Sequence, residues 1–397
     1  MKPWQIFLIG FVLGVIVGAG GLLTWASFKL KSKRRATNLS AAMMPASPGG
    51  APATALRGDT EIAGLLEPIR QKYHLPALGG AIVESEGVSI MAADGLRKQG
   101  ESVGATVEDV WHLGSDTKAM TATMIAALVE RGKLSWDSML GDVFADMRLP
   151  APVEKITLLH LLTHRAGLPA NADWKALSKT GSLVEQRRAA VSQLGSTELL
   201  SSLGSKFVYS NWDYVVAAAM AEQVTGMSYK NLMRTILFEP LHMHSVGYGP
   251  TETSDDLNEP WGHTLHGVSY QVDNPLVMAP AGGVHCSLED WCKFISDQLR
   301  GSEGKRALLK AESYTRLHTA PFGGSYALGW LVANRAWGGG QVFTHAGSNT
   351  LNMAVVWMAP TRDFAVLVVC NQAGSEKACD EVAAGLIALR KRASETR

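Results

Sequence analysis

The sequence predicts an α/β (α+β) fold in which an antiparallel sheet is built from both ends of the body, flanked by helices, with a mostly helical domain inserted between them. Short apolar, strand-like runs occur at residues 79–94 and again at 325–372, whereas the region between them has helical periodicity. Strands at both ends with helices between favour one sheet assembled from the chain termini. The uncharged run Trp4–Phe28 adds an N-terminal transmembrane helix.

The composition describes an ordinary globular protein with an uneven charge distribution. The 397 residues are 46% hydrophobic and 18% charged, which suffices for a large core. Residues 1–35 hold six Lys or Arg and no acid, leaving 31 bases against 36 acids in the remainder. This mildly acidic remainder argues against a nucleic-acid partner, and nothing identifies a protein partner. Structural zinc is excluded by the spacing of Cys286, Cys292, Cys370 and Cys379.

Three segments are predicted along the chain. Residues 1–35 form a transmembrane anchor with a basic flank, because Trp4–Phe28 is long enough to cross a bilayer. A cleaved signal peptide is the alternative, but no clear small-x-small cleavage site precedes the basic run. Residues 36–58 are rich in Ala, Pro, Ser and Gly and are predicted to be a flexible linker. Residues 59–397 form the body, with the helical insert at about 133–309.

The body's elements follow one another in a simple order. The amphipathic run Glu61–Tyr73 predicts a helix, and GGAIVES and VSIMAAD predict a hairpin. The insert contains the helical patterns KITLLHLLTHRAGL, VYSNWDYVVAAAMAEQVTG and LEDWCKFISDQLR. Four runs, SYALGWLVA, QVFTHAGS, LNMAVVWMA and FAVLVVCNQ, then predict an antiparallel meander, which a helix from about Glu376 to Arg392 closes.

Trp111–Gly132 contains a serine and a lysine three residues apart, Ser115 and Lys118, at the start of an apolar helical run. Three-residue spacing on a helix puts the lysine amine within reach of the serine hydroxyl, so the pair can act as nucleophile and base. The simpler interpretation is a helix cap followed by a solvated lysine. Ser302 and Lys305 have the same spacing, but no apolar helix follows them.

Two further stretches complete a candidate site. Tyr209-Ser210-Asn211 directly precedes an apolar helix, and His345-Ala346-Gly347 lies inside a strand-like run. Each pattern alone is weak, since Tyr229-Lys230-Asn231 also fits the first one. Their order along the chain and their settings are the stronger argument.

In these motifs the chain resembles the serine beta-lactamase and penicillin-binding-protein superfamily, in particular its branch of class C beta-lactamases, DD-peptidases and family VIII carboxylesterases. The resemblance spans about residues 60–392. The motifs that carry it occur in the family's order. They are GSDTK at 114–118, LLTHRAGL at 161–168, YSN at 209–211, PAGGVHCSLEDW at 280–291, LGW at 328–330 and HAG at 345–347.

The resemblance implies a role for each catalytic residue. Ser115 would be the acylated nucleophile, Lys118 its partner in proton abstraction, and Tyr209 a second base or proton relay. Asn211 would hold the acyl side of the substrate. A lysine desolvated by an apolar helix loses part of its affinity for protons, and a tyrosine beside that cation is expected to be acidified. Whether Lys118 or Tyr209 is the first base stays open.

The remaining substrate contacts come from the HAG motif and the residue after it. The resemblance implies that the backbone N–H groups of Ser115 and Ser348 receive the negative charge of the transition state, with Gly347 between Ser348 and His345. Beta-lactamases usually carry Lys-Thr-Gly here, and a mostly neutral histidine is a weaker partner for a substrate carboxylate. A Lys-Thr-Gly does occur at Lys179–Gly181, but it precedes YSN in a polar loop.

The function predicted is that of a membrane-anchored serine hydrolase acting through an acyl-enzyme on an ester, a D-amino-acid peptide or a lactam, with esterase or peptidase activity favoured over beta-lactamase activity. The alternative is a catalytically idle fold that binds cell-wall fragments or a protein partner. Neither a cofactor nor a metal is expected, because the histidine pairs at 160/164 and 242/244 lack a third ligand nearby.

The predicted location of the body depends on two opposing arguments. Five bases follow the apolar run and one precedes it, which by the charge rule keeps the body in the cytoplasm. Family members that act on cell-wall peptides work outside the membrane, and a long tether suits an exported domain. We expect the periplasmic or extracellular face, and the cytoplasmic face stays open.

Overall fold

An antiparallel sheet lies at the centre of the computed structural model, which describes residues 58–179, 181–252 and 256–395. Its six strands are arranged in the order β2-β1-β11-β10-β9-β8, so the N-terminal hairpin pairs with the last strand of the C-terminal meander. The prediction of a mixed fold with an antiparallel sheet is confirmed. The strands are β1 Ala77–Glu84, β2 Gly87–Gly95, β8 Leu331–Arg335, β9 Gly340–Ser348, β10 Met353–Ala359 and β11 Phe364–Cys370.

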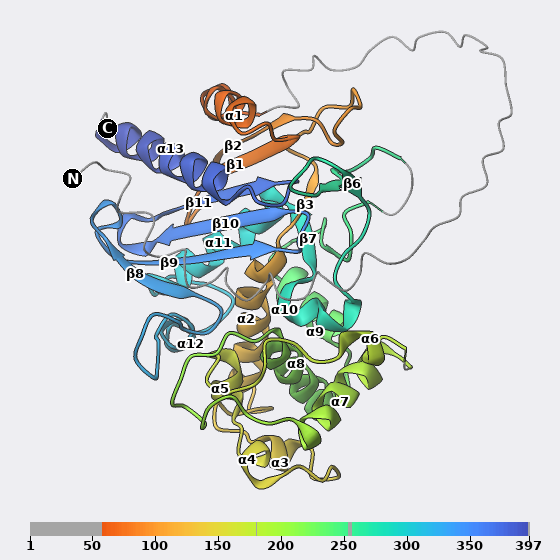
Figure 1. Ribbon diagram of the computed structural model, residues 1–397. Coiled ribbons are helices and arrows are strands. Elements are labelled where there is room, and N and C mark those ends of the chain that lie inside the picture. Colours follow the sequence, from red (N-terminus) through yellow and green to blue (C-terminus); the bar gives the residue numbers. More distant parts are fainter. Residues whose placement is uncertain (1–57, 180, 253–255, 396–397) are drawn as a thin grey trace, which may run out of the picture. The chain divides into compact units, whose positions relative to one another are not determined.

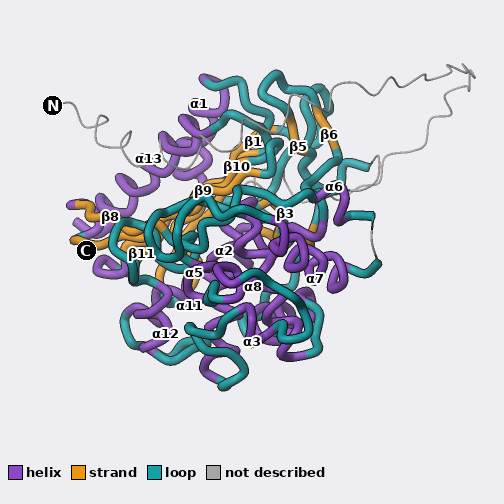
Figure 2. Tube along the Cα trace, turned by 60° about the horizontal axis from the view of Figure 1, so that its bottom comes forward, coloured by secondary structure: helices purple, strands orange, loops and turns teal. Residues whose placement is uncertain are grey.

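Helices cover both faces of this sheet. Consecutive residues of β1 show the two faces: a Cβ on Gly80 would contact Leu66 and Leu386, whereas a Cβ on Gly79 would contact Leu288. Leu66 and Leu386 belong to α1 (Thr60–Lys72) and α13 (Glu376–Glu395), and Leu288 begins α11 (Leu288–Ser302). Figures 1 and 2 show α1 and α13 together on one side of the strands. Because both faces are covered, β10 and β11 are buried along their whole length and read as continuous apolar runs.

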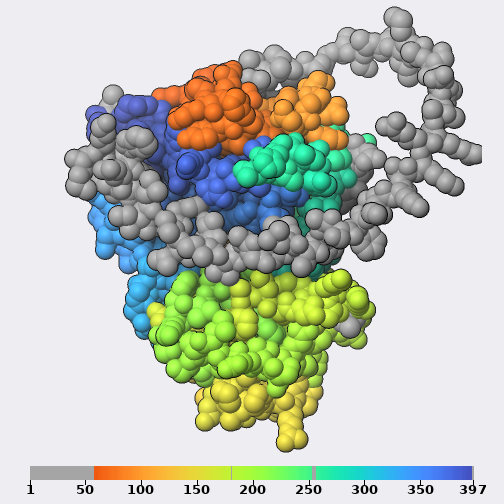
Figure 3. Space-filling view, viewed as in Figure 1, coloured from red at the N-terminus to blue at the C-terminus, as the bar shows by residue number. Residues whose placement is uncertain are grey.

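The region between the strands is mainly helical. The buried helix α2 (Thr117–Glu130) runs from the sheet into it and packs against α8 (Asn211–Thr225). In Figure 3 the helical region forms the yellow and green surface below the orange and blue segments of the sheet region. The other helices are α3 Leu140–Val143, α4 Ala151–Glu154, α5 Leu158–Leu162, α6 Trp174–Leu177, α7 Leu183–Gln193, α9 Tyr229–Met233, α10 Ala279–Gly282 and α12 Ala311–Leu317.

Short strands interrupt this helical region, which the sequence analysis did not predict. A three-stranded sheet has the order β3-β7-β4, and β5 pairs with β6. These strands have two to four residues each, too few to show an alternating pattern. They are β3 Val110–His112, β4 Gly247–Tyr248, β5 Gly262–His263, β6 Ser269–Tyr270 and β7 Val284–Ser287.

One predicted strand begins later than expected. The run SYALGWLVA is a strand only from Leu331 onward. Before it, Gly329 has φ 83°, and a Cβ at that position would lie 2.7 Å from the Cα of Ala119 in α2. The chain therefore turns against α2 before it enters the sheet.

The predictions for the N-terminal segments fall mostly outside the described residues. The transmembrane helix at Trp4–Phe28, the basic flank and the linker up to residue 57 are not described. Among the residues that are, no helix has both the length and the apolar character needed to span a membrane. The four cysteines are buried and unpaired.

A buried ion pair joins α7 to α8 in the helical region. Arg187 donates to both carboxylate oxygens of Glu222, at 2.9 and 2.7 Å, and both side chains are only 2% exposed. Glu222 also accepts the backbone N–H of Tyr229 at 2.7 Å, at the start of α9. Three helices therefore depend on one carboxylate.

Glu222→Ala is expected to lower the free energy of unfolding by about 3–5 kcal/mol, because it leaves the Arg187 guanidinium buried without its counter-ion. Chemical denaturation followed by tryptophan fluorescence measures the loss. Glu239→Ala is the control, since it removes the carboxylate of an exposed pair with Arg234 and should cost less than ~1 kcal/mol. Equal losses in the two variants would refute the importance of the buried pair.

Candidate active site

Ser115 lies at the junction of a short strand and the central helix. It follows β3 and sits in a 3₁₀ turn, Gly114–Asp116, that leads directly into α2. Lys118 follows one turn later and is wholly buried, and its Nζ donates to Ser115 Oγ at 3.2 Å. The structure thus brings the serine and lysine together as their spacing predicts, rather than leaving the lysine in solvent.

The Lys118 amine has three hydrogen-bond acceptors around it. Besides Ser115 Oγ these are Asn211 Oδ1 at 2.9 Å and the carbonyl oxygen of Ala281 at 2.6 Å. Burial lowers the pKa of Lys118 from 10.5 to about 7, although the carboxyl groups of Asp213 and Asp116 act in the opposite direction. At neutral pH a substantial fraction of this amine is therefore unprotonated and able to accept a proton.

Tyr209 also forms a hydrogen bond with Ser115. Its hydroxyl donates to Ser115 Oγ at 2.8 Å, and Lys118 Nζ lies 4.8 Å from the centre of its ring. The expectation that the cation of Lys118 lowers the pKa of Tyr209 is wrong. Burial raises the pKa of the phenol, and the nearby carboxyl groups of Asp116 and Asp213 raise it further, whereas the hydrogen bond with Ser115 lowers it. Tyr209 is therefore a proton donor in the resting site.

Asn211 occupies the first turn of α8, which Ser210 caps by accepting the N–H of Asp213. Its Oδ1 accepts from Lys118, and its Nδ2 donates to Asn171 Oδ1 at 3.1 Å. The side chain that was predicted to hold the substrate therefore also holds the amine in place.

The end of β9 passes directly beside the backbone of Ser115. A Cβ on Gly347 would lie 1.9 Å from the carbonyl oxygen of Leu113 and 2.7 Å from the nitrogen of Ser115, and a Cβ on Gly114 would lie 2.3 Å from the nitrogen of Ser348. Such distances admit no side chain at either glycine. The backbone N–H groups of Ser115 and Ser348 are thus neighbours, and the Ser348 side chain is exposed.

His345 is buried behind the site. Its Nε2 lies 3.3 Å from the hydroxyl of Tyr326, and its Nδ1 lies 3.9 Å from Asp116 Oδ1. Burial lowers the pKa of His345 to about 3, and the charge of Lys118 acts in the same direction. His345 is therefore neutral and offers no fixed positive charge to a substrate carboxylate.

A buried pair that sequence reasoning missed lies beneath Tyr209. His164 Nδ1 is 2.7 Å from Asp213 Oδ2, with both side chains fully buried. The imidazole ring is 4.5 Å from the ring of Tyr209. His164 lies within the LLTHRAGL motif and Asp213 follows the YSN motif by two residues. The two are 49 positions apart, and neither motif indicates that the other holds a partner.

The alternative motif matches have ordinary structural roles. Ser302 ends α11, where its Oγ donates to the carbonyl oxygen of Gln298. Lys305 pairs with Glu303 at 2.7 Å. Tyr229 shares a buried hydrogen bond with Thr121, and Lys179 follows α6, with no contact to the Ser115 site among the described interactions.

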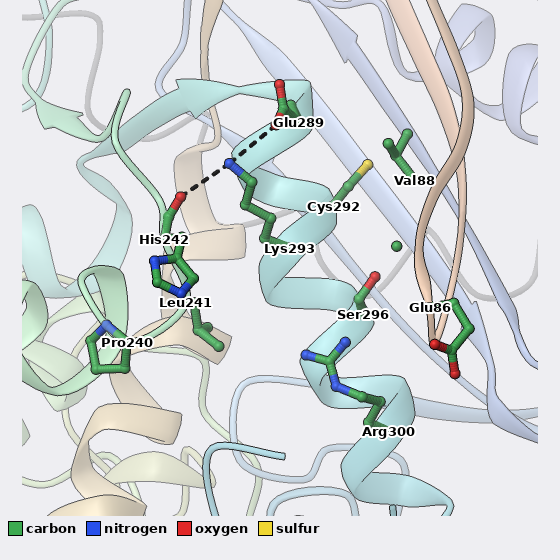
Figure 4. A pocket seen from close by; sticks show the side chains of 11 residues that line it. Glu86, Val88, Pro240, Leu241, His242, Glu289, Cys292, Lys293, Ser296 and Arg300 are labelled. Atoms are coloured by element: carbon green, nitrogen blue, oxygen red, sulfur yellow. Dashed lines mark hydrogen bonds and ion pairs between the residues drawn. The ribbon is translucent and has the colours of Figure 1, made fainter. Parts of the chain in front are cut away.

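A cleft of about 420 Å³ lies elsewhere, between α11 and the β1–β2 turn. Figure 4 shows Lys293 directed to the carbonyl oxygen of His242 and to Glu289. Ser296 and Arg300 donate to the carbonyl oxygens of Glu84 and Ser85. Lys293, Ser296 and Arg300 thus each have a partner within the protein, and the candidate site remains the one around Ser115.

A serine at the start of a helix, bonded to a buried lysine and a tyrosine and placed beside two neighbouring backbone N–H groups, defines a class: hydrolases that form an acyl-enzyme on serine. The family model described as Beta-lactamase matches residues 62–389. The chain belongs to this beta-lactamase family of serine hydrolases, which also includes penicillin-binding proteins.

Curated relatives are distant and longer than this chain. "Protein flp" of Staphylococcus aureus (strain COL) is 24% identical over 321 residues, which are 78% of this chain and 62% of that protein. "Penicillin-binding protein 4*" of Bacillus subtilis (strain 168) is 25% identical over 221 residues, 54% of this chain and 47% of that protein. The match thus covers less than two thirds of the length of either relative.

Solved structures confirm the fold. The octameric penicillin-binding protein homologue from Pyrococcus abyssi has a TM-score of 0.70 at 23% identity, covering 83% of this chain and 76% of that one. SurE, in a crystal structure with D-Leu, has a TM-score of 0.67 at 21% identity, covering 81% and 73%. At such identities the similarity concerns the fold alone.

The rate at which a fluorophosphonate labels Ser115 is expected to rise with pH, with its midpoint near 7, because only an unprotonated amine can accept a proton from the serine. Labelling rates across a pH series measure this. Lys118→Arg should remove the labelling throughout, since a guanidinium keeps its proton, whereas Lys179→Ala should keep the wild-type profile. A midpoint at the ordinary lysine value of 10.5 would contradict the expectation that a buried Lys118 amine controls the labelling.

Proposed function

We propose that this protein is a membrane-anchored serine hydrolase that cleaves esters or D-amino-acid peptides through an acyl-enzyme at Ser115. The observation that carries the proposal is the pair of hydrogen bonds to Ser115 Oγ, from Tyr209 at 2.8 Å and from Lys118 at 3.2 Å. Together they place a proton acceptor and a proton donor on the same nucleophile, next to the N–H groups of Ser115 and Ser348.

The first half-reaction follows from these positions. Ser115 Oγ attacks the carbonyl carbon of the substrate and gives its proton to the neutral amine of Lys118. The carbonyl oxygen becomes an oxyanion, which the N–H groups of Ser115 and Ser348 stabilise. The intermediate then collapses, the bond to the leaving group breaks, and the leaving group takes a proton from Tyr209, which recovers one from the Lys118 ammonium.

The second half-reaction releases the acyl group. A water molecule attacks the ester carbon of the acyl-enzyme and loses its proton to the same lysine–tyrosine pair. The same two N–H groups stabilise the oxyanion of this second intermediate. When the intermediate collapses, its bond to Ser115 Oγ breaks and Ser115 Oγ takes back its proton. We assign Lys118 as the first base, because burial lowers the pKa of the lysine to about 7 and raises that of Tyr209.

The choice of substrate class depends on His345. A neutral, buried imidazole provides no strong partner for the carboxylate that a beta-lactam carries, so we place ester and peptide hydrolysis ahead of lactam hydrolysis. A D-amino-acid group on the substrate remains in the proposal, and the structural neighbour SurE solved with D-Leu supports including one in the assays.

The purified full-length chain is expected to hydrolyse p-nitrophenyl butyrate or a D-alanyl-D-alanine peptide faster than nitrocefin. Ser115→Ala, the blank, should lose at least ~10³-fold in rate because the nucleophile is absent. Lys179→Ala should leave every rate unchanged, because the residue lies away from the site. If none of the three substrates is turned over and the fluorophosphonate does not label the protein, a binding scaffold is favoured instead.

The anchor is part of the proposal. The uncharged run Trp4–Phe28 supports a single membrane-spanning helix at the N-terminus, and we place the body on the periplasmic or extracellular face. Fusions of the chain to alkaline phosphatase and to β-galactosidase test this, with phosphatase activity expected. Activity of the β-galactosidase fusion alone would put the body in the cytoplasm, and full release of the chain from membranes by a carbonate wash would refute the anchor.

A further inference from the structure

A line of buried hydrogen bonds begins at the backbone that carries the nucleophile. Gly114, directly before Ser115, donates its N–H to His112 Nδ1 at 3.0 Å. Because Nδ1 accepts this bond, the ring hydrogen resides on Nε2. His112 Nε2 lies 2.9 Å from Asp273 Oδ2, with side-chain exposures of 0% and 3%. The imidazole thus connects the nucleophile's turn to one oxygen of the Asp273 carboxylate.

The other oxygen of the same carboxylate leads to the opposite side of the site. Asn349, directly after Ser348, donates its Nδ2 to Asp273 Oδ1 at 3.0 Å. The carbonyl oxygen of the Asn349 side chain accepts the backbone N–H groups of Leu351 at 3.2 Å and Asn352 at 2.9 Å. Asn349 therefore fixes the turn that ends β9, and Asp273 fixes Asn349.

The two segments joined in this way are the ones that meet at the proposed oxyanion hole. A Cβ on Gly114 would lie 2.3 Å from the Ser348 nitrogen, so the segments touch without any side chain between them. Contact between the two segments sets only the smallest distance at which they can lie. A carboxylate that binds both segments, one through each oxygen, sets the separation and the orientation of their N–H groups.

We infer that Asp273 is a positioning residue that holds the two oxyanion-hole segments in register, acting through His112 on the Ser115 side and through Asn349 on the Ser348 side. The inference rests on the proposed function, because it concerns the hole used by that reaction. Asp273 is not a catalytic residue, since its contacts are with His112 and Asn349 rather than with Ser115, Lys118 or Tyr209.

Asp273→Asn is the sharpest test of this role. The amide has nearly the shape of the carboxylate, but only one of its two ends is an acceptor, so it cannot satisfy both His112 and Asn349. One segment is then released while the fold is kept. Loss of an oxyanion-hole donor costs on the order of 10²–10³ in kcat, and we expect a fall in kcat for p-nitrophenyl butyrate of about 10- to 100-fold, with KM nearly unchanged.

The control is Asp290→Asn, which alters another buried carboxylate. Asp290 is 3% exposed and accepts hydrogen bonds from the backbone and side chain of Ser245, away from Ser115. The Asp290→Asn variant is expected to have a lower temperature of unfolding and an unchanged kcat. A merely structural role for Asp273 would give this same result.

A spectroscopic readout separates the hole from general damage. The fluorophosphonate adduct on Ser115 places its phosphoryl oxygen at the two N–H groups, so the ³¹P chemical shift of the adduct reports on them. We expect a changed shift in Asp273→Asn and the wild-type shift in Asp290→Asn. If Asp273→Asn does not fold, His112→Phe puts an aromatic ring without nitrogen atoms in the place of the imidazole, and it is expected to show the same slow turnover and changed shift.

The outcomes distinguish this inference from the function on which it rests. Wild-type protein that is not labelled at Ser115 and turns over no substrate defeats the proposed function. Labelled, active wild type together with a folded Asp273→Asn or His112→Phe variant that has wild-type kcat and ³¹P shift overturns the positioning role alone. Slow turnover with unchanged KM and a changed ³¹P shift supports it.

Discussion

The burial of the Lys118 amine is the constraint on which the site depends. A lysine that keeps its proton at neutral pH cannot activate a serine, and water around the amine would keep its pKa near the ordinary value. The structure removes that water by placing the lysine in a helix whose residues 117–128 are all buried. Three oxygen acceptors replace the water, so the buried amine is held in one position.

The acceptors around Lys118 come from distant parts of the chain, and this explains the arrangement of the fold. Asn211 is contributed by the first turn of α8 and Ala281 by α10, both of which pack against α2. β9 brings Ser348 to the same point from the sheet. Gly282 lies against the same turn, since a Cβ there would lie 3.3 Å from the carbonyl carbon of Gly114. The sheet and the helical region meet at the start of α2, and the site is that junction.

How far the sequence predicts this structure depends on the range of the interactions. The apolar strands, the helix after Ser115 and the Ser115–Lys118 contact follow from local patterns, and they agree with the structure. The strands of two to four residues are too short to show an alternation of apolar and polar residues. The contact between His112 and Asp273 joins residues 161 positions apart, and only the folded chain shows that they meet.

The wrong expectation for Tyr209 shows where reasoning from nearest neighbours fails. The cation of Lys118 does lie near the phenol, but burial affects the phenol more strongly, and the carboxyl groups of Asp116 and Asp213 add to it. Both acids are buried, and burial raises their pKa values against the charge of Lys118. Desolvation disfavours the charged form of each group, so it keeps the proton on Tyr209, whose charged form is the phenolate, and takes the proton from Lys118, whose charged form is the ammonium. That difference assigns opposite directions of proton transfer to two groups that contact the same oxygen.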